Sequence, residues 1–163
     1  MKRILMIAII LNVTFGFAQS EFYSTAIGIR AGETSGLTIK QFLGGSSTAL
    51  EGIVGIWSHG LSATLLFEKY APAGVTGLNW YYGAGGHVAF ETVRNNWYYR
   101  NDRYYEYRHD HVGIGIDGIV GIEYKIKPIP IALSFDIKPF IELNNHGGAL
   151  VALDPGLGVK LAF

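Results

Sequence analysis

Apolar and polar positions alternate with a period of two along almost all of this chain after residue 20. In the stretch LSATLLFE, residues 61–68, every second residue is apolar, and the residues between them are mostly small or polar. A strand whose two faces meet different surroundings has this pattern. The pattern predicts eight strands, at residues 23–32, 37–42, 49–56, 61–68, 78–90, 112–125, 133–138 and 153–163.

The predicted strands are joined by short segments rich in Gly, Ser and Asn, such as 33–36, 58–60 and 144–148. No connection is long enough and helical enough to cross between parallel strands, so neighbouring strands must run antiparallel. A chain of 163 residues has room for one sizeable core. The sequence therefore predicts a single all-β domain, an eight-stranded antiparallel up-and-down barrel.

The two faces of these strands differ in an unusual way. One face is Leu, Ile, Val, Ala and Phe, whereas the other is Gly, Ala and Ser with about one charge per strand. A soluble, lipocalin-like barrel would turn the apolar face inward and expose mostly Gly and Ala to water, which disfavours this alternative. The reverse arrangement fits a transmembrane β-barrel, whose outside meets lipid and whose narrow lumen is filled by side chains. The predicted lumen polar network comprises Arg30, Lys40, Glu51, Glu68, His87, Asp117, Glu123, Asp136, Lys138, Asp154 and Lys160.

Aromatic residues mark one rim of the predicted barrel. Tyr23, Trp80, Tyr82, Tyr124 and Phe163 fall at corresponding strand ends, and we expect all five to face outward. Such a girdle is typical of the boundary between hydrocarbon and lipid head groups. The sheet must then close, because an open edge in hydrocarbon leaves backbone groups unpaired.

Composition and the N-terminal sequence indicate where the protein is located. The chain is 49% hydrophobic and 16% charged, has no cysteine and carries no formal net charge. This balance gives no basic excess to attract nucleic acid. Lys2-Arg3, the apolar run 4–13 and Gly16-Phe17-Ala18 have the features of a secretory signal peptide. We therefore expect cleavage after a signal peptide at 1–18, which leaves a barrel domain at 19–163.

The passage RNNWYYRNDRYYEYRHDH, residues 94–111, is the most unusual stretch. A strand entering at the periplasmic side crosses the bilayer by about Phe90, given roughly 9–11 residues per spanning strand. We therefore expect 91–111 to form a hairpin that projects outside the cell. Its aromatic and basic residues suit contact with lipopolysaccharide or a surface partner, or they pair across the hairpin and only stabilise it. The predicted contact residues are Trp97, Tyr98, Tyr99, Arg100, Arg103, Tyr104, Tyr105 and Tyr107.

Few residues offer chemistry. A three-residue hairpin tip at 101–103 would place His87 opposite Asp117 and Glu91 opposite Gly113. The pair of His87 and Asp117 is interpreted as a structural ion pair or hydrogen bond, with an acid/base pair or a proton-sensitive gate as the alternative.

Catalytic and metal-binding patterns are weak. Ser58-His59, Ser62 and His146 are the available nucleophile and base types, but adjacent strand residues point apart and match no hydrolase motif. His109 and His111 could share a face, yet a third metal ligand is not evident. We therefore predict no catalytic residue, no metal and no cofactor.

Together, a signal peptide, eight alternating strands and the ending LGVKLAF resemble the small eight-stranded outer-membrane β-barrel proteins of Gram-negative bacteria, of the OmpA-barrel, OmpX and OmpW type. The segment GLNWYYGAGGHVAF is similar to one branch of these proteins. The resemblance covers the predicted mature chain. It implies an outer-membrane location, contact with membrane lipid and lipopolysaccharide, and a C-terminal assembly signal at Phe163 that the barrel-assembly machinery reads.

These observations predict an integral outer-membrane barrel with a side-chain-filled lumen and a structural, adhesive or surface-interaction role. Two alternatives remain open at this point. One is a narrow pore or transporter for small or apolar solutes, and the other is an outer-membrane enzyme that modifies lipid A.

Overall fold

The structure is a computed structural model, and it describes the backbone of residues 23–44, 46–57, 60–100, 103–144 and 149–163. The side chains at positions 57, 91–111 and 144 lie outside this description. The predicted signal peptide, Ser58, His59 and His146 also lie outside the described residues.

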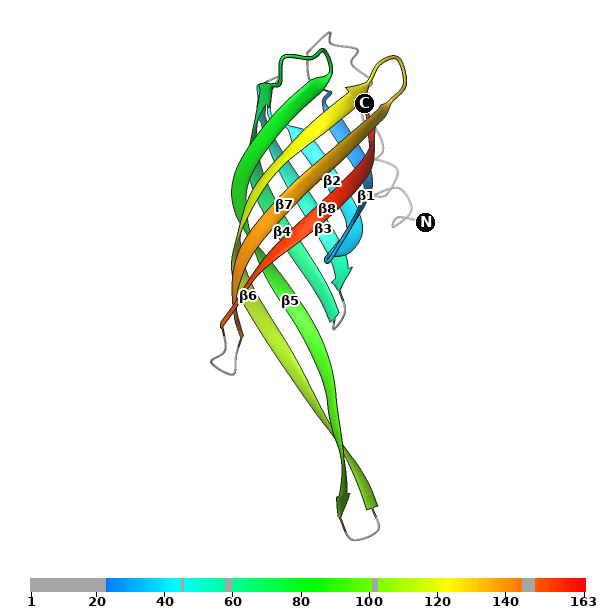
Figure 1. The fold of residues 1–163 in the computed structure, drawn as a ribbon, viewed down its shortest axis with the longest axis vertical. Coiled ribbons are helices and arrows are strands. Elements are labelled where there is room, and N and C mark those ends of the chain that lie inside the picture. The colour runs from blue at the N-terminus through cyan, green and yellow to red at the C-terminus, as the bar shows by residue number, and fades with distance from the viewer. Residues whose placement is uncertain (1–22, 45, 58–59, 101–102, 145–148) are drawn as a thin grey trace, which may run out of the picture.

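Eight strands form one closed barrel in which each strand pairs antiparallel with its neighbours in the chain, and β8 pairs with β1 (Figure 1). The prediction of an all-β, eight-stranded up-and-down barrel is therefore confirmed. No helix in the described part of the chain is long and apolar enough to cross a membrane. The strands are β1 (Thr25–Gly32), β2 (Ser35–Phe42), β3 (Thr48–Trp57), β4 (Gly60–Pro72), β5 (Leu78–Arg100), β6 (Arg103–Ile126), β7 (Ile131–Asn144) and β8 (Ala149–Ala162).

The C-terminal residue takes part in closing the barrel. The backbone amides of Ser24 and Thr25 donate to the carbonyl oxygen of Phe163, at 3.0 and 2.8 Å, and the Phe163 amide donates to the Thr25 carbonyl at 2.8 Å. We call this end of the barrel the terminal end. The opposite end, from which β5 and β6 project, is the ribbon end (Figure 1).

The barrel wall differs greatly in height around its circumference. β1 and β2 have 8 residues each, whereas β5 has 23 and β6 has 24. Beyond the barrel, β5 and β6 pair only with each other and continue as a two-stranded ribbon as far as Arg100 and Arg103 (Figure 1). The backbone thus forms the projecting hairpin that the alternation predicts. The side chains of its predicted contact residues lie outside the described part.

The register of this hairpin corrects one expectation. His87 faces Gly115 rather than Asp117, and Glu91 faces His111 rather than Gly113. Pairing extends to Arg100 opposite Arg103, so the connection is shorter than the predicted tip, and a bulge between Arg94 and Trp97 shifts the register. Because the error below the bulge amounts to two residues, His87 and Asp117 keep their predicted inward face.

β7 and β8 are longer than their predicted segments, 133–138 and 153–163. Pro139 follows the predicted end of β7 and has no N–H to donate. The ladder between β6 and β7 accordingly lacks the pairs at Pro139 and Lys138, but it resumes at Phe140 opposite Asp117. On the other side, Pro139 pairs with Leu153 of β8. The strand therefore tolerates its proline through a local gap on one side only.

The outer surface of the barrel is apolar. Leu37 on β2, Ile116 on β6 and Val151 on β8 are 66%, 67% and 72% exposed, and outward Leu, Ile, Val and Phe side chains occur on every strand. At the terminal end, Trp80, Tyr82, Tyr124 and Phe163 also face outward. The core lies inside the barrel, so the lipocalin-like alternative, with the apolar face inward, is wrong.

Tyr23 was expected in the outer aromatic girdle, and this expectation is wrong. Its hydroxyl donates to Glu123 Oε1 at 2.8 Å, and its ring packs edge-on against Phe42, with centroids 4.9 Å apart. Tyr23 precedes β1, so the alternation of that strand does not fix its direction. The ring instead covers the inside of the barrel at the terminal end.

Candidate functional site: the polar lumen

The lumen holds charged residues in two groups, one near each end of the barrel. The Lys40 network lies toward the terminal end and comprises Lys40, Glu51, Glu68, Glu123 and Lys160. The Arg30 network lies toward the ribbon end and comprises Arg30, Asp136, Asp154, Lys138, Asp117, His87 and Glu142. All twelve of these side chains are buried. Eleven of them are the residues predicted from alternation, because inward positions recur at every second residue.

The Lys40 network is a hub around one ammonium group. Lys40 Nζ lies 2.9 Å from Glu51 Oε2, 2.9 Å from Glu68 Oε2 and 3.5 Å from Glu123 Oε2. Lys160 Nζ adds a contact of 2.8 Å to Glu51 Oε1. A buried charge without a partner is strongly unfavourable, so three carboxylates here depend on two ammonium groups.

Aromatic rings enclose this hub. Lys40 donates to the Tyr70 hydroxyl, and its Nζ lies 5.0 Å from the centre of the Tyr70 ring and 4.5 Å from that of Tyr81. The two rings stack with centroids 4.9 Å apart. A cation over desolvated aromatic faces is attracted by the ring quadrupole. The two tyrosines therefore hold Lys40 in place while they fill the cross-section of the lumen.

An apolar band separates the two networks. Ile53, Leu66 and Ile119 are 2%, 0% and 4% exposed, and they form one buried cluster with Tyr70 and Tyr81. An eight-stranded barrel is just wide enough for side chains to fill. The Tyr81 hydroxyl donates to Asp136 Oδ2 at 3.1 Å and so connects this cluster to the Arg30 network.

The Arg30 network begins with a fully bonded guanidinium. Arg30 Nη2 and Nε lie 2.7 and 3.1 Å from Asp136 Oδ1, and Nη1 lies 3.0 Å from Asp154 Oδ2. The same guanidinium donates to the backbone carbonyls of Thr34 and Asp154, at 3.0 and 2.9 Å. A planar fork with several fixed donors suits this arrangement better than an ammonium group would.

From Asp154 the network continues as a chain toward the ribbon end. Lys138 Nζ lies 3.5 Å from Asp154 Oδ2 and 3.1 Å from Asp117 Oδ1. Asp117 Oδ2 lies 2.8 Å from His87 Nδ1, and His87 Nε2 lies 2.9 Å from Glu142 Oε2. His87 thus meets Asp117 diagonally across the strand pair rather than directly. Both ring contacts are hydrogen bonds only when the ring carries two protons or a carboxyl group supplies one.

The glycines of the inward face make room for these long side chains. A Cβ at Gly115 would collide with the His87 ring, and a Cβ at Gly156 would collide with the Arg30 guanidinium. The small residues that alternation places on the inner face therefore leave the space that the charged side chains occupy. Gly115 and Gly156 each lie where the strand beside them sends a large polar side chain across the lumen.

One small cavity lies beside His87 near the mouth of the lumen. Its volume is about 10 Å³, and Thr34, Ser62, Glu142 and Phe140 are among its lining residues. The Ser62 hydroxyl is buried there, with no hydrogen-bond partner among the described residues. A cavity of this size holds about one water molecule, which could satisfy that hydroxyl. The space is too small for a solute.

Sequence reasoning missed Glu142 and the roles of Tyr70 and Tyr81. Glu142 shares the inward face with Lys138, but the predicted strand ended at Lys138. Continuing the alternation past Pro139 would have found it. The directions of Tyr70 and Tyr81 also follow from alternation. Their stacking follows from the β4–β5 register, which places them directly opposite each other, and Lys40 reaches both rings from β2.

No family model matches the sequence, and a comparison with curated proteins finds no match. Among solved structures, the barrel is similar to the crystal structure of the N-terminal β-barrel domain of Pseudomonas aeruginosa OprF. The TM-score is 0.57 at 19% identity, over 85% of this chain and 95% of that chain. This chain has the fold of a small outer-membrane β-barrel. At this identity, the similarity shows the fold alone. The role of this chain has to be inferred from its own residues.

The candidate catalytic and metal-binding residues from the sequence can now be located in the barrel. Ser62, one of the nucleophile types, points into the lumen and away from the outer surface. The described residues include no group of three or more His, Asp or Glu side chains arranged to hold a metal ion. His109 and His111 lie outside the described side chains. The two charge networks of the lumen hold the narrow barrel together by ion pairs and hydrogen bonds.

Proposed function

We propose that this chain is an integral outer-membrane protein whose filled lumen makes the barrel a rigid support for the projecting β5–β6 ribbon. The observation that carries the proposal is the contrast between the apolar outer surface of the barrel and its charged lumen. Every outward apolar face suits hydrocarbon, and the buried charges of the lumen pair with one another across it. Lipid requires an apolar outside and a closed sheet. The fold shared with the OprF barrel domain supports the same location.

The location is tested by expressing the full chain in a Gram-negative host. We expect it in the outer-membrane fraction, with a mobility on gels that changes when the sample is heated. Protease added to intact cells should cut within residues 92–111 and leave the barrel whole. Recovery from the soluble periplasm, or complete digestion of the chain, would contradict an integral barrel.

The proposed role of the ribbon is contact with lipopolysaccharide or another molecule at the cell surface. Two features support it. The ribbon rises above a closed barrel, and its sequence brings together five tyrosines and four arginines that suit amphipathic, phosphate-bearing surfaces.

A shortened chain tests this role. In it, the residues between Val93 and His109, which pair in the register, are replaced by Asn-Gly. Such a turn closes a hairpin without disturbing the strands below. We expect the purified variant to fold normally but to lose binding to immobilised lipopolysaccharide. Unchanged binding would remove the ribbon from the proposal and leave a structural barrel.

We propose no catalytic role, because the described nucleophile candidate faces the lumen and both ring nitrogens of His87 are already engaged by carboxylates. The alternative, a lipid A-modifying enzyme, makes a different prediction. Mass spectrometry of lipid A from cells with and without the protein should show the same acyl pattern. An altered pattern would replace the structural role by an enzymatic one.

A further inference from the structure

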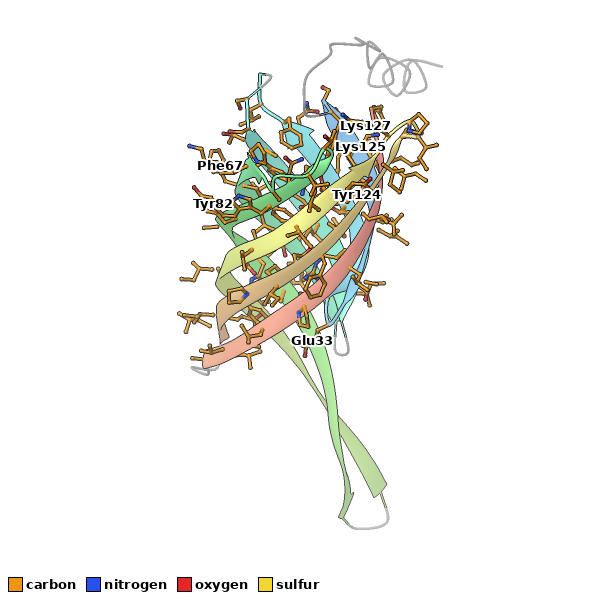
Figure 2. The ribbon with its side chains drawn as sticks, turned by 45° about the horizontal axis from the view of Figure 1, so that its top comes forward. Glu33, Phe67, Tyr82, Tyr124, Lys125 and Lys127 are labelled. Atoms are coloured by element: carbon orange, nitrogen blue, oxygen red, sulfur yellow. The ribbon has the colours of Figure 1, made fainter. Side chains whose placement is uncertain are left out.

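The charges on the outside of the barrel are sorted by end. Among residues whose side chains the structure describes, the acidic side chain exposed to solvent is Glu33, in the β1–β2 turn at the ribbon end. The exposed or half-exposed basic side chains are Lys69, Lys125 and Lys127, and all three lie at the terminal end. Figure 2 shows Lys125 and Lys127 toward one end of the barrel and Glu33 toward the other.

Lys69 belongs to the outer aromatic surface. It lies on β4 directly opposite Tyr82 of β5, and two residues along β5 from Tyr82 is Trp80. The Trp80 and Tyr82 rings stack with centroids 5.3 Å apart. Phe67 extends the same face and is 54% exposed (Figure 2). A lysine beside such rings can lay its aliphatic stem along them and carry its ammonium group to the membrane surface.

Lys125 and Lys127 lie where β6 ends and turns into β7. Lys125 Nζ donates to the backbone carbonyls of Ile129 and Ile126, at 2.7 and 3.3 Å, which fixes its ammonium group within the turn. Lys127 is exposed, and Tyr124 next to them faces outward at 41% exposure. The turn therefore repeats the combination on β4 and β5, in which a basic group lies beside an outward aromatic ring.

We propose that the terminal end of the barrel is a binding surface for the head groups of anionic phospholipids. The aromatic rings of Trp80, Tyr82 and Tyr124 set the depth of the hydrocarbon boundary, and the three lysines then lie at the level of the lipid phosphates. In the described part of this end no acidic side chain is exposed, and the exposed or half-exposed charged side chains there are the three lysines. This inference rests on the proposed membrane location, and it names phospholipid in the leaflet that faces the terminal end.

Trp80 is a natural probe for the lipids that touch this surface. The chain has three tryptophans, and Trp57→Phe with Trp97→Phe leaves Trp80 alone. This chain is reconstituted into phosphatidylcholine vesicles that contain brominated phosphatidylglycerol or, separately, brominated phosphatidylcholine, because bromine quenches a tryptophan it touches. The ratio of quenching at equal mole fraction gives the preference for the anionic lipid.

We expect a preference of about fivefold, the effect of roughly one basic residue near an anionic surface. Lys69→Gln with Lys127→Gln should reduce the preference to below about twofold, because the remaining Lys125 ammonium group is engaged by two backbone carbonyls of its turn. High salt should weaken the preference in the parent chain, since surface charges are screened. Glu33→Gln, at the opposite end, is the matched control and should leave it unchanged.

Equal quenching by the two lipids in the parent chain would overturn the proposal. So would an undiminished preference in the double lysine variant, because Lys69 and Lys127 would then contribute nothing to the attraction. A failure of the membrane location is distinguishable from both outcomes. A chain that does not insert would leave Trp80 unquenched by either lipid and would show no heat-dependent mobility on gels.

Discussion

The two charge networks of the lumen both pair buried basic groups with carboxylates, but they do so in different arrangements. In the Lys40 network, one ammonium group serves three carboxylates, and tyrosine rings enclose it. In the Arg30 network, charges of alternating sign form a chain from Asp136 to Asp117, and His87 extends it to Glu142, so that most members have two partners. Removal of the central ammonium group of a hub takes away a partner of several carboxylates at once, whereas removal of one member of a chain affects only its two neighbours. The comparison therefore predicts graded effects of single substitutions.

The largest effect is expected for Lys40→Met. The variant leaves Glu51 with Lys160, but it leaves Glu68 buried without a cation. Removing one partner of a buried ion pair destabilises by about 3–5 kcal/mol, so we expect a loss in this range. Urea unfolding in detergent micelles, followed by tryptophan fluorescence, measures it. Lys69→Met, which removes an exposed lysine of β4, is the control and should stay within about 0.5 kcal/mol. Equal effects would show that Lys40 is not a hub.

Arg30→Met should be next in size. It leaves Asp136 with the Tyr81 hydroxyl, whereas Asp154 keeps Lys138 and the backbone amides of Glu33 and Thr34. We expect a destabilisation of about 3 kcal/mol, at the lower end for a broken buried pair. Arg30→Lys keeps the charge but loses the planar fork, and it should recover only part of this loss. Full recovery by lysine would mean that charge alone, and not the fork, holds this end of the chain.

The smallest effect is expected at the mouth of the lumen. His87→Phe leaves Glu142 unpaired, while Asp117 retains Lys138 at 3.1 Å. The neighbouring cavity admits about one water molecule, which can partly solvate the freed carboxylate. We therefore expect a loss of about 1–2 kcal/mol, the range for a buried group that loses its partner. A loss as large as that of Lys40→Met would contradict the distinction between hub and chain.

Much of this architecture is present in the sequence as a period of two. The alternation predicted the eight strands and the eleven charged residues that proved to be buried, because a narrow barrel sends every second side chain inward. It failed for Tyr23, which lies before its strand, and for Glu142, which lies beyond a proline. At Tyr23 the alternation extends beyond the strand, whereas at Glu142 the strand extends beyond the predicted segment.

Other features depend on the register between strands, which the alternation does not specify. The direct pairing of His87 with Asp117 was wrong by two residues, because the connection at the tip is one residue shorter than predicted and the bulge between Arg94 and Trp97 shifts the register by one more. The diagonal contact of 2.8 Å still forms, since a shift of two keeps the face. The division into a hub and a chain follows from the three-dimensional stagger of the strands, which alternation alone does not specify.

The current through a planar lipid bilayer distinguishes a filled lumen from a pore. The purified chain should give no discrete conductance steps, because Tyr70, Tyr81, Leu66 and their neighbours fill the cross-section between the two networks. Tyr70→Ala with Tyr81→Ala removes the two stacked rings, and it should produce steps in the same bilayer, which verifies insertion. Discrete, reproducible steps from the unaltered chain would contradict the filled lumen and establish a narrow pore in its place.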